Sequence, residues 1–364
     1  MRYIGNKTRL IPFLIGAIDR LGLEPGVACD PFSGTASVAR ALKGQGWRVH
    51  CGDLMALSYA FQVARVELDR TPDYPSSLLG SPPRGRPRTA SYGAVIEALE
   101  ALPPTAGFLT AHYAPSGRGG RENGRMYFTP DNAARIDAIR DRIFDWSDDG
   151  RLDRPREQLL LATLLQAADS VANTTGVYAS FVKTWQPNAV KPLRLRAMRP
   201  TAPGRPEANG CTAFLGPADV LVERLGAIDL LYLDPPYNGR QYPGYYHVPE
   251  LVAKGWRPPP RLRGKTGLIP DRDLRSDWCR RGRCERALRE LLDRADVHHL
   301  LLSYNDEGLL PAETIEAAFR ETGDPDSYRR FDLGYRRYRS DADRPGRRYR
   351  GDEVRERLHY VRRH

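Results

Sequence analysis

The sequence predicts an α/β fold in which a parallel sheet flanked by helices is interrupted by a mainly helical insertion. Short apolar segments of strand character alternate with helical segments toward both ends of the chain. Two of these strands run directly into acidic turn sequences that contain glycine or proline. The residues between these regions carry strong helix signals instead. Parallel strands joined by helices bind ligands at the carboxyl ends of the strands, so we expect a site there.

The first elements form a strand, helix, strand unit. A helix is expected over 10–21, followed by a short buried strand over 27–30 that ends in an aspartate. A turn containing glycine leads into a helix over 34–43, and a second strand over 48–53 also ends in an aspartate. The two aspartates should therefore lie at the same edge of the sheet.

The middle of the chain carries loop and helix signals. Residues 71–91 are rich in Pro, Gly, Ser and Arg, which is typical of a loop or linker. Thr129 is a suitable N-cap, and Pro130 occupies the first position of a predicted helix. A second helix over 158–171 is apolar enough to be buried between neighbours.

Sheet character returns in the last third of the chain. A strand over 228–233 runs directly into the tetrapeptide 234–237, Asp-Pro-Pro-Tyr. A further buried strand is expected over 300–304 and a helix over 311–320. From Tyr328 onward, the Arg-rich tail suggests edge strands with turns.

The chain length indicates more than one compact body. Single hydrophobic cores stop growing at about 250–300 residues, and this chain has 364. We therefore predict a catalytic-sized domain made of 1–70 and 207–364. An inserted lobe would span 71–206.

Composition excludes two classes of protein. Hydrophobic residues make up 41% of the chain, which is enough to build a core, so a disordered chain is excluded. No run of about 18 apolar residues occurs, and the N-terminus lacks the apolar segment of a secretory signal. We therefore expect a cytoplasmic protein that does not enter a membrane.

The cysteines do not indicate a structural framework or a metal. Their number is odd, and Cys29, Cys51, Cys211, Cys279 and Cys284 are scattered, which favours reduced thiols over disulfides. Cys279 and Cys284 lie close in sequence but lack a second ligand pair at the usual spacing, so no metal site is expected.

Positive charge is concentrated in one stretch of the predicted insertion. The chain has 56 Lys+Arg against 45 Asp+Glu, a formal net charge of +11, and guanidinium groups bind phosphate oxygens well. Residues 183–205 contain no acid and include Trp185. A nucleic-acid contact and a solvated loop both fit this composition. The candidate contacts to nucleic acid are Lys183, Lys191, Arg194, Arg196 and Arg199.

The tetrapeptide at 234–237 is the strongest chemical signal. Two prolines cannot extend a strand, so they form a rigid corner. The Asp234 carboxylate and the Pro235 carbonyl can both accept hydrogen bonds from one planar amine, while Tyr237 offers a ring face for stacking. Such a corner suits a nucleobase amine, which becomes a better nucleophile when two acceptors form hydrogen bonds with its N–H groups. A strand that simply ends in a turn, with Asp234 as a cap, is the alternative.

The segment 30–35, Asp-Pro-Phe-Ser-Gly-Thr, is a second strand-end motif. Gly34 lets the backbone approach a ligand, and Asp30 can accept hydrogen bonds from a cofactor. The three spaced glycines of a dinucleotide-binding turn are missing, which disfavours a nicotinamide or flavin oxidoreductase.

Four blocks of the chain, taken in order, resemble the Dam-like adenine-specific DNA methyltransferases. The blocks are residues 2–7 (RYIGNK), 30–34 (DPFSG), 234–237 (DPPY) and 245–250 (YYHVPE). In this family's alpha group, the cofactor motif comes first along the chain, a large insertion follows, and the catalytic motif comes last. This chain has the same order. The resemblance implies a Rossmann-like domain that uses S-adenosylmethionine, with the insertion as the target-recognition lobe.

The resemblance also implies residue roles. Asp234 and Pro235 would hold the target amine, and Tyr237 would stack on an adenine flipped out of the duplex. Pro236 completes this catalytic tetrapeptide. The one departure is Ala36, which stands where many relatives have a second glycine, so the loop would approach the cofactor less closely.

The same resemblance implies a cofactor site. Lys7 would line the methionine end of the cofactor, Asp53 would hold the ribose hydroxyls, and Asp219 would lie near the cofactor adenine. The implied cofactor residues are Tyr3, Gly5, Lys7, Asp30, Phe32, Gly34, Thr35, Asp53, Leu54 and Asp219.

The function expected from these residues is adenine N6 methylation of double-stranded DNA. An RNA base methyltransferase, which would use the same tetrapeptide, is the nearest alternative, and a cytosine amine is a less favoured DNA target. A nucleic-acid-binding subunit without catalysis is the alternative from a different class. Restriction or phage-defence proteins are compatible partners.

Overall fold

The computed structural model describes residues 1–80, 88–269, 274–336 and 353–363 of the chain. It divides the chain into two compact units, which we call the sheet unit and the helical unit. The sheet unit takes residues 5–62, 201–241 and 274–364, and the helical unit takes residues 1–4, 63–200 and 242–273.

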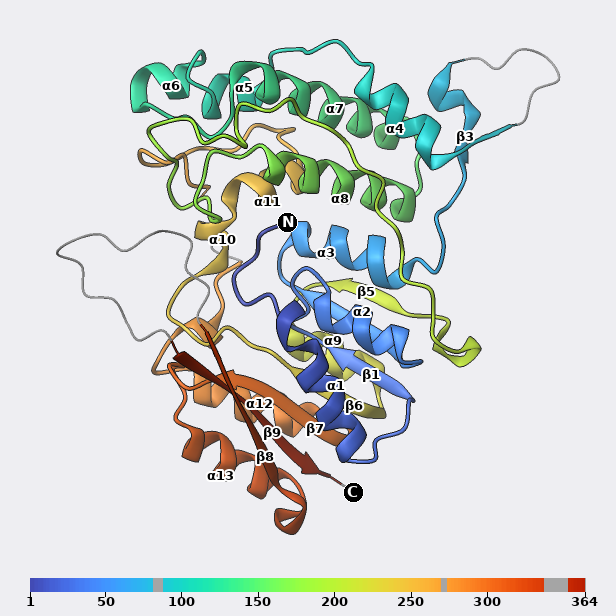
Figure 1. Cartoon of the computed structure of the whole chain (residues 1–364), viewed down its shortest axis with the longest axis vertical. Helices are drawn as coiled ribbons and strands as arrows, with labels where there is room; N and C mark the ends of the chain where they lie inside the picture. The colour runs from blue at the N-terminus through green and yellow to red at the C-terminus, as the bar shows by residue number, and fades with distance from the viewer. Residues whose placement is uncertain (81–87, 270–273, 337–352, 364) are drawn as a thin grey trace. The chain divides into compact units, whose positions relative to one another are not determined.

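The sheet unit contains a seven-stranded sheet with the order β5-β2-β1-β6-β7-β9-β8 (Figure 1). The five strands from β5 to β7 are parallel, whereas β9 is antiparallel to both of its neighbours. The strands are β1 (Val27–Asp30), β2 (Arg48–Asp53), β5 (Thr212–Leu215), β6 (Ile228–Leu233), β7 (Val297–Asn305), β8 (Arg329–Arg336) and β9 (Glu353–Arg362).

Helices cover both faces of this sheet. The main apolar core lies between the sheet and three helices, where Leu231, Leu300 and Leu302 are fully buried. Those helices are α9 (Ala218–Leu225), α12 (Cys284–Arg294) and α13 (Ala312–Thr322). On the opposite face lie α1 (Ile11–Arg20) and α2 (Ser37–Gly44) (Figure 1), and α3 (Ala56–Gln62) follows β2.

The order in which successive strands are added to the sheet reverses at β1. The connection through α2 leads from β1 to β2 on one side, and β6 pairs with the other side of β1, with Cys29 opposite Leu231. A crevice forms outside the carboxyl ends of parallel strands at such a switch point, and ligands of open α/β sheets bind there. Asp30 ends β1 and Asp234 directly follows β6, so both motif aspartates lie at this point.

The helical unit is built mainly from α7 and α8. Thr129 caps α7 by accepting a hydrogen bond from the Asn132 amide at 3.3 Å, as the sequence predicts. Asp137 of α7 accepts amide hydrogen bonds from Leu109 and Thr110 at the start of α5, each at 2.8 Å. The helices are α4 (Tyr92–Glu100), α5 (Phe108–Tyr113), α6 (Arg118–Asn123), α7 (Pro130–Asp148), α8 (Arg154–Ser170), α10 (Tyr242–Tyr245) and α11 (His247–Lys254).

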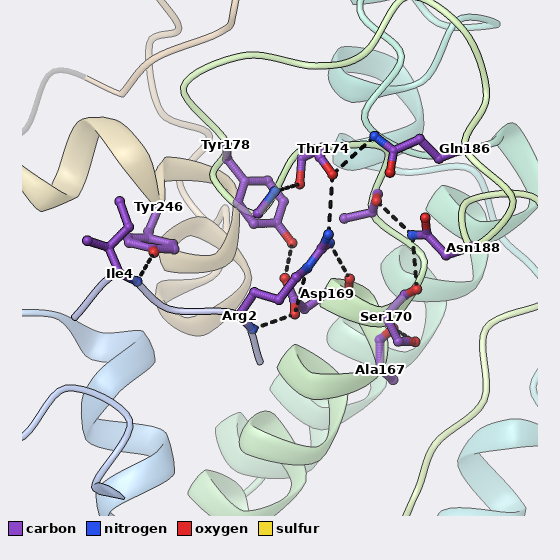
Figure 2. Close-up of polar contacts among 12 residues, drawn as sticks. Arg2, Ile4, Ala167, Asp169, Ser170, Thr174, Tyr178, Gln186, Asn188 and Tyr246 are labelled. Carbon is purple, nitrogen blue, oxygen red and sulfur yellow. Dashed lines mark hydrogen bonds and ion pairs between the residues drawn. The ribbon is translucent and has the colours of Figure 1, made fainter. Parts of the chain in front are cut away.

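The first residues of the chain are bound into the helical unit (Figure 2). The Arg2 amide donates to Oδ2 of Asp169 at 2.8 Å, and its guanidinium donates to the carbonyl oxygens of Asp169 and Thr174. The Tyr246 hydroxyl accepts from the Ile4 amide at 2.6 Å. The N-terminal motif is therefore anchored on one side by the loop at Thr174, which the sequence places in the insertion.

The expected α/β fold is confirmed, and its compact units divide the chain differently from the predicted domains. The helical unit also includes residues 1–4 and 242–273, which the sequence analysis assigned to the other domain. Part of the expected loop at 71–91 is ordered as a small hairpin of β3 (Tyr74–Pro75) and β4 (Thr89–Ala90), while 81–87 lie outside the described residues.

The Arg-rich tail also differs from expectation. Of the two strands in the described part of the tail, β8 lies at the edge of the sheet, whereas β9 lies between β7 and β8. Residues 337–352 of the tail lie outside the described part of the chain. Within the described residues, no helix combines the length and apolar character needed to cross a membrane.

Candidate active site at the carboxyl ends of the strands

The glycine loop joins the ends of β1 and β2. The Ser33 amide donates to the Gly52 carbonyl at 3.0 Å, and the Gly34 amide donates to Oδ2 of Asp53 at 3.1 Å. The other oxygen of Asp53 accepts from the Met55 amide at 2.9 Å. Gly34 has a φ of 50°, a conformation that glycine adopts without steric cost. Asp53 thus shapes the loop in addition to the cofactor role that the family resemblance implies.

Ala36 carries backbone strain at the end of this loop. Its φ of 65° and ψ of 34° are left-handed, and it is the one non-glycine residue with positive φ in the described chain. Its amide closes a turn on the Ser33 carbonyl at 2.7 Å. A left-handed alanine costs about 1–2 kcal/mol, which gives a physical reason for the glycine of related loops.

The Asp-Pro-Pro-Tyr corner binds the N-terminal motif. Nζ of Lys7 lies 3.2 Å from Oδ1 of Asp234 and 5.9 Å from the centroid of the Tyr237 ring. The Tyr237 carbonyl accepts a hydrogen bond from the Leu309 amide at 2.9 Å, which fixes the corner against the loop that follows β7. Pro235 is buried, whereas Pro236 and Tyr237 are half-buried.

A third residue completes this ion cluster. The Lys7 ammonium also pairs with Oε1 of Glu356 on β9, and the same oxygen accepts a hydrogen bond from the Ser303 hydroxyl on β7. All three side chains are buried. Sequence reasoning missed Glu356 and Ser303, because one lies in the Arg-rich tail and the other inside an apolar strand.

Burial and charge shift the titration of this cluster. Burial disfavours the Lys7 cation, but the Asp234 and Glu356 carboxylates outweigh that effect and raise the pKa of Lys7 above its usual range. Burial, together with the charge of Glu356, raises the pKa of Asp234 to about 7, although Lys7 opposes the shift. Asp234 therefore changes protonation near neutral pH.

Asp30 lies beside the same cluster. Burial raises its pKa to about 8, and the charges of Asp234 and Asp53 add to the effect. Among the described residues, Oδ1 of Asp30 is buried without a hydrogen-bond partner. A buried acceptor without a donor lowers the stability of a protein that has no ligand bound. This atom therefore fits a ligand that carries N–H groups or positive charge.

The N-terminal motif also binds the glycine loop. Nδ2 of Asn6 donates to Oγ1 of Thr35 at 3.3 Å, next to the residue that pairs with Asp234. Gly5, with a φ of 79°, turns the chain just before this contact. The structure therefore brings three of the four motif blocks together: the part of the N-terminal block from Gly5 onward, the glycine loop and the catalytic corner.

Two other predicted cofactor residues flank the loop. The Phe32 ring packs edge-on against Trp278, with centroids 4.9 Å apart and an interplanar angle of 72°. Leu54 is half-buried directly after Asp53. Trp278 is an aromatic neighbour that no sequence motif marked.

Asp219 and Tyr3, which were predicted to bind the cofactor, make other contacts in the structure. Oδ2 of Asp219 accepts from Nη1 of Arg294 at 2.8 Å, so its carboxylate is turned toward α12. Tyr3 belongs to the helical unit, where its ring stacks on Tyr246 at 4.7 Å and contacts Tyr242 at 5.7 Å.

The fourth motif block lies in the helical unit as well. His247 is buried, and burial lowers its pKa to about 4. Its Nε2 lies 3.1 Å from the Thr266 carbonyl. Glu250 pairs with Lys254 at 3.5 Å. The His247 contact ties α11 to Thr266, whereas the Glu250 pair lies within the helix, and neither contact by itself indicates chemistry.

Residues 191–200 of the basic stretch form a segment of the helical unit without helix or strand, along which buried and exposed side chains alternate. The amides of Leu193 and Leu195 donate to the side chains of Asn132 and Glu100 at 2.8 and 2.7 Å, and both leucines are buried. The intervening and flanking cations therefore face solvent. The exposed residues are Lys183, Lys191, Arg194, Arg196 and Arg199.

The cysteines are buried. None of the five forms a disulfide. Burial raises the pKa of Cys279 to about 11, so its thiol is unreactive at neutral pH. The described residues contain no cluster of three or more His, Cys, Asp or Glu side chains that could hold a metal.

Comparison with known proteins identifies a family and several relatives. The model of the D12 class N6 adenine-specific DNA methyltransferase family matches residues 3–276. The type II methyltransferase M.NlaIII of Neisseria lactamica is 32% identical over 345 residues, which cover 94% of this chain and 93% of the relative.

Two longer relatives match this chain over part of their length. The type II methyltransferase M.FokI of Planomicrobium okeanokoites is 33% identical over 93% of this chain and 50% of its own. The modification methylase StsI of Streptococcus sanguinis is 31% identical over 93% of this chain and 49% of its own. The chain thus spans about half the length of these two relatives.

Proposed function

Because the chain belongs to the D12 class N6 adenine-specific DNA methyltransferase family, we propose that it transfers a methyl group from S-adenosylmethionine to the N6 amine of adenine in duplex DNA. The adenine would lie in a specific sequence and would be flipped out of the helix to reach the enzyme. The sheet unit would carry the chemistry, and the helical unit would recognise the target.

The observation that supports this proposal most directly is the Asp234 corner at the switch point of the sheet. Asp234 is an acceptor held by Lys7 at 3.2 Å, and the half-buried Tyr237 follows in a turn fixed by Leu309. A planar amine can donate to the Asp234 carboxylate while its ring stacks on Tyr237. Stacking of a base on an aromatic ring contributes about 1–3 kcal/mol, which offsets much of the cost of flipping.

The acceptor raises the reactivity of the amine. An exocyclic amine is a weak nucleophile because its lone pair is delocalised into the ring. When Asp234 accepts a hydrogen bond from the amine, electron density shifts onto the amine nitrogen. Asp234 therefore favours attack by this nitrogen on the methyl carbon of the cofactor. The methylated nitrogen must lose one proton, and Asp234, with a pKa of about 7, is a base of suitable strength to receive it.

The residues of the glycine loop fit the proposed cofactor. When bound, S-adenosylmethionine supplies an electrophilic methyl group on a positively charged sulfur. We propose that Asp30, with its unpartnered buried oxygen, holds a donor group of this cationic molecule. Asp53 and the half-buried Phe32 would line the rest of the site. Asp219 is left out of this proposal because Arg294 engages its carboxylate.

Exposed cations support DNA binding by the helical unit. Arg194, Arg196 and Arg199 all face solvent on a segment pinned by buried leucines. Guanidinium groups on a fixed segment contact phosphates at a lower entropic cost than those on a free loop.

We further propose a place in a restriction-modification system. The relatives are named type II methyltransferases and modification methylases, and a nuclease that reads the same sequence would be the natural partner.

Transfer of labelled methyl groups tests the proposed activity. The purified chain would be incubated with labelled S-adenosylmethionine and either duplex DNA or RNA of the same sequence, and the nucleosides would be separated. We expect N6-methyladenine from DNA. Label in RNA or in cytosine would favour the other amine methyltransferases, and DNA binding without any transfer would indicate a subunit without catalysis.

A further inference from the structure

We propose that Glu356 and Ser303 are positioning residues that hold the Lys7 ammonium against Asp234, so that Lys7 serves the amine-binding corner and not the cofactor. This inference rests on the proposed function, since it assigns a role within the same site. It differs from the family resemblance, which implies that Lys7 lines the methionine end of the cofactor.

The contacts of Lys7 all point to the corner. Its Nζ lies 3.2 Å from Oδ1 of Asp234, pairs with Oε1 of Glu356 and lies 5.9 Å from the Tyr237 ring centroid. The lysine is 5% exposed, so water does not compete for its ammonium. Two carboxylates on one buried cation fix its position more tightly than either carboxylate does alone.

Glu356 is a rigid anchor for this cation. It lies on β9, an interior strand, with Asn305 of β7 opposite it on one side and Leu333 of β8 opposite it on the other. Its Oε1 also accepts from the Ser303 hydroxyl, and both side chains are almost fully buried. A lysine side chain is flexible along four carbons, and this anchored glutamate removes that freedom.

The fixed cation keeps Asp234 an acceptor. The groups that face Asp234 are Lys7 from the N-terminal segment, Glu356 from β9, Asp30 from β1, Tyr232 from β6 and Tyr237 from its own turn. Lys7 is the one cation among these five groups. Without it, burial and two neighbouring carboxylates would favour the protonated acid, which donates a hydrogen bond and cannot accept one from an amine.

Two substitutions of Glu356 separate its charge from its positioning role. Glu356→Gln keeps an oxygen that accepts from both Lys7 and Ser303 but removes the negative charge. The pH at which methyl transfer is half-maximal should therefore fall by about one unit. Glu356→Ala removes the same charge but also releases Lys7, whose effect on the Asp234 carboxyl is larger than that of Glu356. That midpoint should therefore rise by about one unit, and kcat should fall roughly ten- to a hundredfold.

His359→Gln is the matched control, because this residue is also buried on β9 but contacts Tyr328. It should keep the wild-type pH midpoint, and thermal melting of each variant would verify its fold. Equal kcat and equal pH midpoints for wild type, Glu356→Gln and Glu356→Ala would overturn the proposal. So would a tenfold loss of cofactor affinity with kcat unchanged, which would return Lys7 to the cofactor site.

A spectroscopic titration distinguishes this inference from the proposed activity. The carboxyl carbon of Asp234 would be followed by NMR in the cofactor-free protein, with Asp234→Asn to assign the signal. We expect a midpoint near 7 in wild type, as burial and Glu356 dictate, and opposite shifts in the two Glu356 variants. These shifts require no DNA substrate, so they test the ion cluster even if methyl transfer to DNA is not observed. Shifts in the same direction would refute the positioning role.

Discussion

Lys7, near the start of the chain, places its Nζ 3.2 Å from Oδ1 of Asp234, the first residue of the Asp-Pro-Pro-Tyr corner. Asn6, the preceding residue, donates to Thr35 in the glycine loop. The N-terminal motif therefore connects two strand ends that are distant in sequence. Because little of either side chain is exposed to water, the charge balance of this pair controls the protonation of Asp234 near neutral pH.

Replacing Asp234 by alanine should strongly reduce methyl transfer while the protein stays folded. The substitution removes the acceptor for the target amine, and loss of one such interaction costs roughly 10²–10³ in kcat. Transfer of labelled methyl groups to DNA measures the effect. Asp219→Ala is the matched control, since that carboxylate pairs with Arg294, and it should retain activity. Wild-type activity in Asp234→Ala would refute the catalytic assignment.

Activity should fall as pH drops through about 7. The pKa of Asp234 is raised to about 7 by burial and by Glu356. Below that pH the carboxyl is protonated and loses its role as acceptor, so kcat should decrease by up to about tenfold per pH unit. A pH profile of single-turnover methyl transfer checks this expectation. A flat profile between pH 5.5 and pH 7 would contradict it.

Cofactor binding should release a proton from Asp30. Its pKa of about 8 means that the carboxyl is mostly protonated at pH 7 in the free protein. A cationic partner favours the carboxylate, so affinity for S-adenosylmethionine should rise with pH between 6 and 8. Calorimetry in two buffers of different ionisation enthalpy counts the protons. Asp30→Asn should remove the pH dependence, and proton uptake by the wild type would rule out this assignment.

The exposed arginines of the helical unit should set the salt dependence of DNA binding. Replacing Arg194, Arg196 and Arg199 by glutamine should weaken binding and lower the slope of log K against log salt by up to about three. A matched triple variant of exposed arginines already paired with glutamates should change the slope less. These control residues are Arg286, Arg289 and Arg320. An unchanged slope in the first variant would exclude the stretch from the interface.

Local sequence pattern predicted the parts of the site that lie at strand ends. Asp30 and Asp53 each end a predicted strand and Asp234 directly follows one, and a parallel sheet brings the carboxyl ends of its strands to one edge. The glycine loop and the proline corner could be recognised because their backbone chemistry is visible in residue type.

Residues that depend on pairing between distant segments could not be predicted in this way. Glu356 lies in an Arg-rich tail whose composition suggests an exposed edge, and only insertion of β9 between β7 and β8 buries it. Asp219 has the right place in sequence, but its partner Arg294 comes from another helix. Residues 242–273 likewise join the helical unit through tertiary packing. One example is the hydrogen bond that Nε of Arg140 donates to the Val252 carbonyl.

Mapping modified bases in a genome tests the central claim most directly. The chain and its Asp234→Ala variant would be expressed separately in a host that lacks DNA methylation, and each genome would be sequenced by a method that detects modified bases. We expect N6-methyladenine within one recurrent sequence in cells that carry the wild-type chain, and none in cells that carry the variant. Unmodified adenines with the wild-type chain, or the same modification with the variant, would contradict the account.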